Sequence, residues 1–335
     1  MDFRTELNLT SSPHSITRST ALLTIGSCFA DVIGSRLYHN KLPVLVNPFG
    51  TIFNPISISK LLKQAFQKQV PQEELYLLQQ ESWFHYDFHS SIWASSKNQL
   101  QNFTQQRLNE VYQWLQKTDV LIITLGTAYV YRHLETDQIV ANCHKTPGKF
   151  FKKELLSVEA CTNELTEVLE QIRVLRPSLR VVLTVSPVRH TRDTLPLNAV
   201  SKSVLRLACH FLSEVLSYVD YFPAYELLLD DLRDYRFYKS DLIHPSDLAE
   251  TYIFNQFSDV YFSEDLKKFV LEWQKIQQAL AHRPLQPNTS AHRQFLEKLL
   301  VKLTSLSSQI DVQTEIEEVK KRLYNLTPND ESIFP

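Results

Sequence analysis

Glycine is scarce in this chain, with only five among 335 residues. Three of them, Gly26, Gly50 and Gly126, follow short apolar runs and stand beside polar side chains. Because so glycine-poor a chain does not use glycine as filler, each of the three predicts a sharp turn or a close approach of another backbone.

Other scarcities argue against whole classes of protein. The four cysteines lack CxxC spacing, which disfavours a zinc ribbon and a disulfide framework. A net charge of −2 offers no basic footprint for nucleic acid. No apolar run approaches the ~20 residues of a membrane span, and the first residues show no basic segment followed by an apolar one. We therefore expect a cytoplasmic protein that binds neither nucleic acid nor membrane.

Apolar runs alternating with helical periodicity predict a parallel sheet covered by helices on both faces. We expect an α/β fold, a flavodoxin-like three-layer α/β/α sandwich whose five parallel strands follow the order 2-1-3-4-5. Ligands of such folds bind beyond the carboxyl ends of the strands, where several of the polar motifs would converge. The expected strands are 21–25, 43–46, 120–125, 180–185 and 218–222, and the main expected helices are 28–38, 56–67, 106–117, 158–174 and 199–216.

Two insertions and a C-terminal extension complete the predicted organisation. Residues 1–280 form the α/β domain, with insertions near 81–105 and 129–145, of which 129–140 alternates like a β-hairpin. Residues 281–335 form a helical extension whose two amphipathic segments join near Asp311. Exposed apolar stripes on these segments would allow copies of the chain to pair as a homo-oligomer.

Two motifs predict nucleophilic catalysis. Ser27 stands on a strand-to-helix turn, where a helix N-terminus stabilises nucleophiles and oxyanions. In Asp241-Leu242-Ile243-His244, the Asp241 carboxylate can orient the His244 imidazole, which would then act as general base. The structural alternative makes Ser27 a helix cap and Asp241 a turn cap. Cys28 is a rival nucleophile, but we expect it to pack inward.

Six motifs in order resemble the GSCFA family, a branch of the SGNH/GDSL hydrolase superfamily. They are Gly26-Ser27-Cys28-Phe29-Ala30, Asn47-Pro48-Phe49-Gly50, Thr124-Leu125-Gly126-Thr127, Asn142-Cys143-His144-Lys145, Ser186-Pro187-Val188-Arg189-His190 and Asp241-Leu242-Ile243-His244-Pro245. The resemblance covers roughly the first three quarters of the chain. It implies the SGNH fold and a catalytic triad of Ser27, Asp241 and His244.

The resemblance also implies an oxyanion hole made by the N–H groups of Ser27 and Gly50 and an asparagine side chain. Ala128 occupies the place of that asparagine and cannot donate a hydrogen bond. Asn47, Thr127 and Asn142 are the candidate replacements.

Further polar residues are candidate substrate contacts. Asn142, His144 and Arg189 could hold a ligand, although turn hydrogen bonds or a carboxylate partner for Arg189, such as Glu226 or Asp193, would also explain them. His85 and His89 would share a helix face, but no third ligand is recognisable, so we expect no metal site. No cofactor is implied.

These observations predict a serine-dependent esterase or acyltransferase acting on a small-molecule or carbohydrate ester. Two alternatives remain open. The first is a catalytically weak or inactive binding protein that lost its oxyanion asparagine. The second is an assembly protein that associates through its C-terminal helices.

Overall fold

The computed structural model describes residues 4–326 and divides the chain into two compact units, with the boundary between Phe262 and Ser263. By this division helix α8 (Glu264–Ala281) belongs to the second unit. The domain boundary near residue 280 stays a prediction from the sequence. The last part of the predicted extension, residues 327–335, lies outside the described residues.

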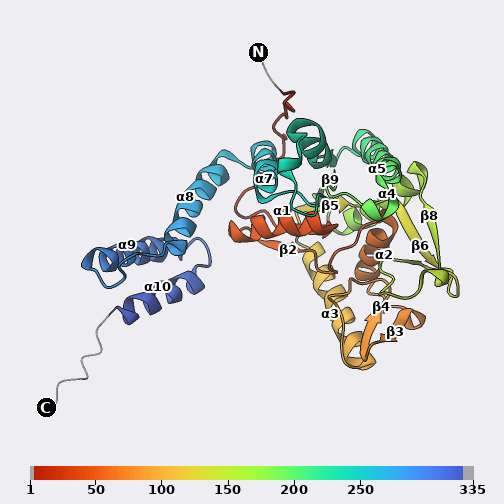
Figure 1. Cartoon of the computed structure of the whole chain (residues 1–335), viewed down its shortest axis with the longest axis horizontal. Coiled ribbons are helices and arrows are strands. Elements are labelled where there is room, and N and C mark those ends of the chain that lie inside the picture. The colour runs from red at the N-terminus through yellow and green to blue at the C-terminus, as the bar shows by residue number, and fades with distance from the viewer. Residues whose placement is uncertain (1–3, 327–335) are drawn as a thin grey trace. The chain divides into compact units, whose positions relative to one another are not determined.

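The first unit is built on a parallel sheet with the order β10-β9-β5-β1-β2. Numbered along the chain, this is the predicted order 2-1-3-4-5, so the fold prediction is confirmed. Figure 1 shows helices packed around this sheet. The central strands are almost entirely buried because helices surround the sheet. The strand bounds are β1 (Leu22–Gly26), β2 (Val44–Val46), β5 (Val120–Leu125), β9 (Arg180–Val185) and β10 (Val219–Tyr221).

Most helices of the first unit begin after a side-chain cap, as Ser27, Asn54, Ser96, Ser157 and Ser246 each accept a backbone N–H of the first turn. The helix α1 contacts α7, whereas α2 contacts α3 and α4, and α4 contacts α5. The bounds are α1 (Cys28–His39), α2 (Pro55–Phe66), α3 (Lys97–Leu115), α4 (Val158–Leu175), α5 (Leu195–Val215), α6 (Ala224–Glu226) and α7 (Asp247–Tyr261).

Two small antiparallel sheets lie in and next to the two insertions. Strands β3 (Tyr76–Gln79) and β4 (Ser82–His85) pair as a hairpin. The hairpin predicted over 129–140 is confirmed as β6 (Tyr129–His133) and β7 (Ile139–Val140), and β8 (Phe151–Leu155) adds a third strand that the sequence analysis did not predict.

In the second unit, the two predicted amphipathic segments are confirmed as α9 (Ser290–Leu306) and α10 (Gln313–Asn325), which contact each other. Their buried residues are Leu296, Leu299, Leu303, Ile316 and Val319.

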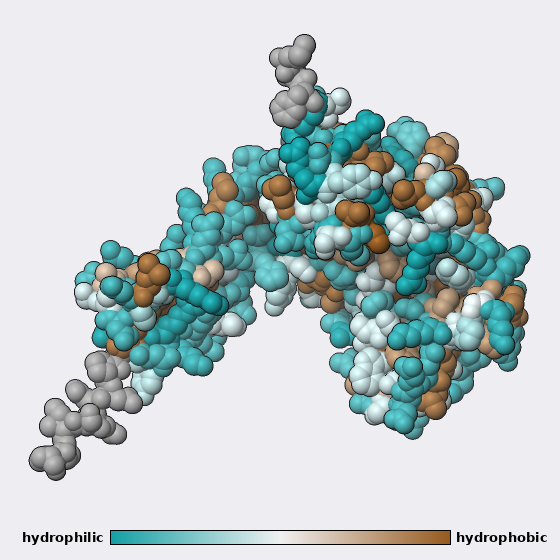
Figure 2. Space-filling view, in the orientation of Figure 1, coloured by the Kyte–Doolittle hydropathy of each residue, from teal (hydrophilic) through white to brown (hydrophobic). Residues whose placement is uncertain are grey.

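Hydrophilic residues predominate on the face drawn in Figure 2, and the apolar ones are scattered among them. Across residues 4–326, none of the helices combines the length and apolar character needed to cross a bilayer.

Candidate active site

The turn after β1 depends on the missing side chain of Gly26. A Cβ at this position would lie 2.1 Å from the carbonyl oxygen of Thr124 on β5, and the φ angle of +142° is rarely adopted by other residues. The next amide, that of Ser27, donates to the same oxygen at 2.9 Å. The glycine therefore lets β5 hold the beginning of α1 at close range.

The next two residues differ in exposure. Ser27 is 0% exposed and its Oγ accepts the N–H of Phe29 at 3.3 Å, as a helix cap does. Cys28, the first residue of α1, is partly exposed. Cys28 therefore packs inward in part, as its largely buried thiol shows. The cap directs the Ser27 hydroxyl toward the helix's own amides.

Charges of both signs act on the Cys28 thiol. Burial raises its pKa, and the carboxylate of Asp31 in the same helical turn raises it further. The Lys202 ammonium and the N–H groups of Cys28 and Phe29 lower it, with a smaller combined effect. The resting side chain is therefore a protonated thiol beside groups that would stabilise its anion.

The structure brings Asp241 and His244 together. Oδ2 of Asp241 lies 2.7 Å from Nδ1 of His244, while its Oδ1 accepts the N–H groups of Ile243 and His244 at 2.9 and 3.0 Å. These hydrogen bonds hold the pKa of the Asp241 carboxyl well below its usual range. No hydrogen bond joins His244 to Ser27, both of which the structure describes, so the triad is not closed in this conformation.

The two amides predicted for the oxyanion hole both have partners. Ser27 donates to Thr124, and the N–H of Gly50 donates to the carbonyl of Asn47 at 2.8 Å. The side chain of Asn47 is also engaged, because its Oδ1 accepts the Gly26 N–H at 3.0 Å and its Nδ2 donates to Asp31 at 3.0 Å. In this arrangement these groups stabilise the loop after β2.

Thr127 and Ala128 also have structural roles: Thr127 forms hydrogen bonds and Ala128 packs in the core. Thr127 Oγ1 lies 3.0 Å from Ser201 Oγ and accepts the N–H of Tyr129 at 3.0 Å. Ala128 is fully buried within the main hydrophobic core, so its methyl group faces the core. An asparagine at position 128 would be buried there.

Lys202 is the main feature that the sequence analysis missed. It is 2% exposed, and its Nζ donates to the carbonyl oxygens of Gly126 at 2.8 Å and Ser186 at 2.7 Å, just beyond β5 and β9. Burial lowers its pKa to about 7. The available signal was its place on the apolar stripe of α5, between Asn198 and Leu205, where a lysine is unusual.

His190 lies close to this lysine. Its Nε2 is buried without a hydrogen-bond partner, and its ring meets Phe53 edge-on at 5.1 Å. Burial and the nearby Lys202 charge lower its pKa to about 4. The imidazole is therefore neutral near pH 7 and can donate or accept a hydrogen bond with a ligand.

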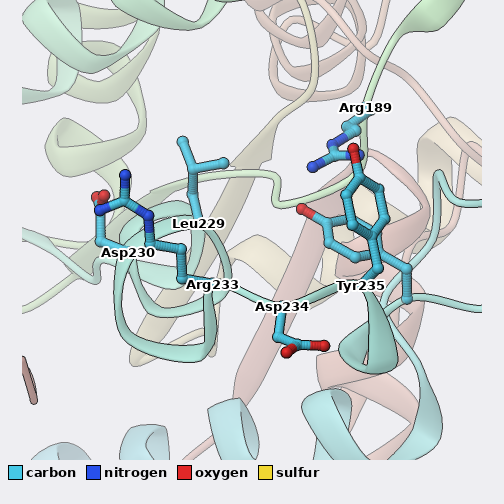
Figure 3. Close-up of a pocket in the computed structure, with 7 residues that line it drawn as sticks. Arg189, Leu229, Asp230, Arg233, Asp234 and Tyr235 are labelled. Carbon is cyan, nitrogen blue, oxygen red and sulfur yellow. The ribbon is translucent and has the colours of Figure 1, made fainter. Parts of the chain in front are cut away.

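Arg189 lines a pocket of about 410 Å³ (Figure 3). It also contacts the Asp241–His244 loop, since its Nη1 donates to the carbonyl of Leu242 at 3.4 Å. Its guanidinium lies 4.1 Å from the ring centroid of Tyr238, and its backbone N–H donates to the carbonyl of Ile243. The carboxylates proposed as its alternative partners are engaged elsewhere, Glu226 with Arg206 and Asp193 with Lys153. The pocket is lined by Arg189, Leu229, Asp230, Arg233, Asp234, Tyr235 and Tyr238.

Asn142 and His144 belong to the packing of the insertions. Asn142 Oδ1 accepts the N–H of His144, whose Nε2 donates to the carbonyl of His85 at 2.9 Å and whose ring stacks on Phe84. His85 ends β4 and His89 lies in the loop that follows, so the assumption of a shared helix face was wrong. Within residues 4–326, no three His, Cys, Asp or Glu residues are grouped to hold a metal ion.

Comparisons with known proteins give the family. Among solved structures, a Streptococcus pneumonia protein described as "a putative platelet activating factor" is similar at 10% identity, a TM-score of 0.36, and coverage of 71% of this chain and 84% of its own. A carbohydrate esterase family 3 protein from Talaromyces cellulolyticus is similar at 9% identity, a TM-score of 0.35, and coverage of 76% and 99%. A search of curated proteins gave no significant match. The model of the GSCFA family matches residues 21–257 and that of the GSCFA C-terminal domain matches residues 273–325, so the chain belongs to the GSCFA family.

Proposed function

We propose that this protein transfers acyl groups from esters, as an esterase or an acyltransferase, using a nucleophile on the turn after β1. The observation that carries the proposal is the Asp241–His244 pair. A carboxylate that accepts two backbone N–H groups and the imidazole Nδ1 fixes the tautomer whose Nε2 can take a proton.

In this mechanism Nε2 of His244 accepts the proton of the nucleophile, which attacks the acyl carbon. The same imidazole returns the proton to the leaving alkoxide. Water or an alcohol then attacks the acyl carbon of the acyl-enzyme while His244 accepts its proton, and the imidazole returns that proton to the nucleophile as the acyl group leaves. The contact between His244 and the nucleophile forms only when substrate is bound, as is common for catalytic hydrogen bonds.

The substrate class that we propose is a small-molecule or carbohydrate ester. The pocket that Arg189 lines supports this proposal, because its guanidinium lies over the rings of Tyr235 and Tyr238 and has no carboxylate partner among the described residues. A guanidinium held in this way suits a carboxylate or phosphate group on the substrate.

The experiment measures hydrolysis of a panel of p-nitrophenyl acyl esters and acetylated sugars by the wild type and three variants. We expect His244→Ala and Asp241→Asn to lower kcat by about 10²-fold or more. His14→Ala, which removes an exposed histidine of the same unit, should leave kcat unchanged. Equal loss in all three variants, or no turnover of any ester by the wild type, would contradict the proposal and favour a binding protein.

A further inference from the structure

His89 lies in the loop after β4 and packs against the loop that follows β2. A Cβ added to Gly50 would lie 2.5 Å from the Cβ of His89 and 3.1 Å from its Nδ1. The missing side chain of Gly50 therefore makes room for this imidazole ring. The backbone N–H of His89 also donates to the carbonyl of Phe49 at 3.3 Å. These two contacts hold His89 against the loop after β2.

The loop after β2 is joined to the turn after β1, which carries the proposed nucleophile. The Oδ1 of Asn47 accepts the N–H of Gly26 at 3.0 Å, and the N–H of Ile52 donates to the carbonyl of Gly26 at 2.8 Å. Gly50 lies between these two anchoring residues, and the ring of His89 lies against Gly50. His89 is therefore at the same edge of the sheet as the nucleophile, although it is distant along the chain.

The hydrogen bonds of Nδ1 fix the tautomer of His89. The backbone N–H of Ser91 donates to Nδ1 at 3.3 Å, and the Ser91 hydroxyl lies 2.9 Å from the same atom. A backbone N–H can only donate, so Nδ1 is the acceptor and the neutral imidazole carries its proton on Nε2. Burial lowers the pKa of His89, and the Asp31 carboxylate opposes this with a smaller effect. The neutral ring is therefore the main form at pH 7.

The N–H at Nε2 is a free hydrogen-bond donor at this edge. The side chain of His89 is partly exposed, and among residues 4–326 its Nε2 has no hydrogen-bond partner. The N–H groups of Ser27 and Gly50 are engaged with backbone carbonyls, and the side chain of Asn47 is engaged as well. An oxygen that gains negative charge at this edge would therefore find its donor in His89.

We propose that His89 is a catalytic residue whose Nε2–H donates a hydrogen bond to the acyl oxygen in the transition state. This inference rests on the function proposed above. As the nucleophile attacks the acyl carbon, the π electrons of the carbonyl move onto its oxygen, and His89 stabilises that oxyanion. The carbonyl forms again when the alkoxide leaves. The proton stays on Nε2 throughout, so no bond to His89 is made or broken. His89 thereby takes the role of the asparagine whose place Ala128 occupies.

The first test separates hydrogen bonding from packing, using the full chain with p-nitrophenyl acetate as substrate. We expect His89→Ala to lower kcat by about 10²-fold and to change KM by less than about 3-fold, because the hydrogen bond strengthens only in the transition state. His89→Gln keeps an amide that can donate, so its kcat should be at least about 10-fold above that of His89→Ala. Ser90→Ala, which changes the exposed neighbour in the same loop, should keep the wild-type kcat.

The outcomes distinguish this inference from the function on which it rests. Turnover by the wild type with an unchanged kcat in His89→Ala would overturn the role of His89 and leave acyl transfer intact. An equal loss of kcat in His89→Ala and His89→Gln would assign the effect to packing and would overturn the inference as well. If the wild type turns over no ester, the proposed function fails and the donor role fails with it.

The second test needs no enzymatic activity. Long-range ¹H–¹⁵N NMR spectra of the histidine-labelled wild type distinguish the two neutral tautomers, and the signals of His89 are those missing from His89→Gln or His89→Ala. We expect the proton of His89 to lie on Nε2 at neutral pH. A proton on Nδ1 would overturn the inference, because Nε2 would then accept a hydrogen bond and could not stabilise an oxyanion.

Discussion

At the scale of single residues, Asp31 opposes the ionisation of the neighbouring thiol. It lies in the first turn of α1, where its charge raises the pKa of Cys28 in addition to burial. Asp31→Asn removes the charge at nearly constant size, so the pKa of Cys28 should fall. We expect alkylation of Cys28 at pH 7 to accelerate about 3- to 10-fold, because one pKa unit changes the thiolate fraction tenfold.

The rate of Cys143 alkylation, measured in the same sample, controls for unfolding. Asn47 and Thr51 donate to the Asp31 carboxylate, and an asparagine oxygen can accept both hydrogen bonds. A slower reaction of Cys28 in the variant would contradict the electrostatic role of Asp31.

The lowered pKa of Lys202 predicts that the free energy of unfolding depends on pH. Burial lowers its pKa from 10.5 to about 7. Between these values the unfolded chain holds a proton that the folded chain has released, so the free energy of unfolding rises with pH. The increase should be about 1.4 kcal/mol per pH unit within the window. Lys202→Met has no such titration, so the stability of the wild type relative to this variant should increase from pH 7.5 to pH 9.

Urea unfolding of both proteins at the two pH values measures this difference. Other titrating groups are shared and cancel in the comparison. A stability difference that does not change with pH would show that Lys202 titrates close to its unfolded value.

The sequence predicted the local geometry of the site better than its long-range contacts. The spacing of Asp241 and His244 is sufficient to predict that they meet, because both side chains belong to one turn. Whether Ser27 or Cys28 is exposed depends on the direction of a helix cap, which residue types do not determine. The position of Lys202 depends on the carbonyl oxygens of Gly126 and Ser186, which are distant along the chain.

At the scale of elements, the closeness of β1 and β5 predicts which glycine is indispensable. Gly26→Ala would place a Cβ 2.1 Å from the Thr124 carbonyl at a φ of +142°. We expect a loss of more than about 2 kcal/mol in the free energy of unfolding, since both a clash and a strained backbone oppose the alanine.

Gly148→Ala is the matched control, because no atom lies within 4 Å of the added Cβ and φ is not in the strained region. Its effect should stay within about 0.5 kcal/mol. Thermal unfolding of both variants gives the comparison, and equal stability would show that the turn after β1 can rearrange.

The strands of the parallel sheet were predictable because they are continuous apolar runs, and the predicted ranges of β5 and β9 match their bounds. Strand β8 was missed because Phe151 alone of its five residues is buried. Helix α3 begins at Lys97 and not near 106, since its first turns are mostly polar and give little periodicity.

At the scale of the whole molecule, the family matches follow the two units. The match over residues 21–257 lies in the first unit and the match over 273–325 lies in the second. Every residue assigned to the proposed chemistry belongs to the first unit. The second unit contributes a helix pair whose apolar stripes are at least partly buried, although Val301 and Tyr324 are 70% and 75% exposed.

This division predicts that a chain ending at Phe262 forms the same acetyl adduct as the full chain. We expect a similar yield on the same residue after reaction with p-nitrophenyl acetate, because the first unit holds the sheet and its core. Circular dichroism and a cooperative thermal transition would establish that the shorter chain is folded. A folded but unreactive short chain would show that the second unit takes part in the chemistry.

Light scattering of both chains tests the predicted homo-oligomer as well. A dimeric full chain with a monomeric short chain would support pairing through the C-terminal helices, whereas two monomers would contradict it.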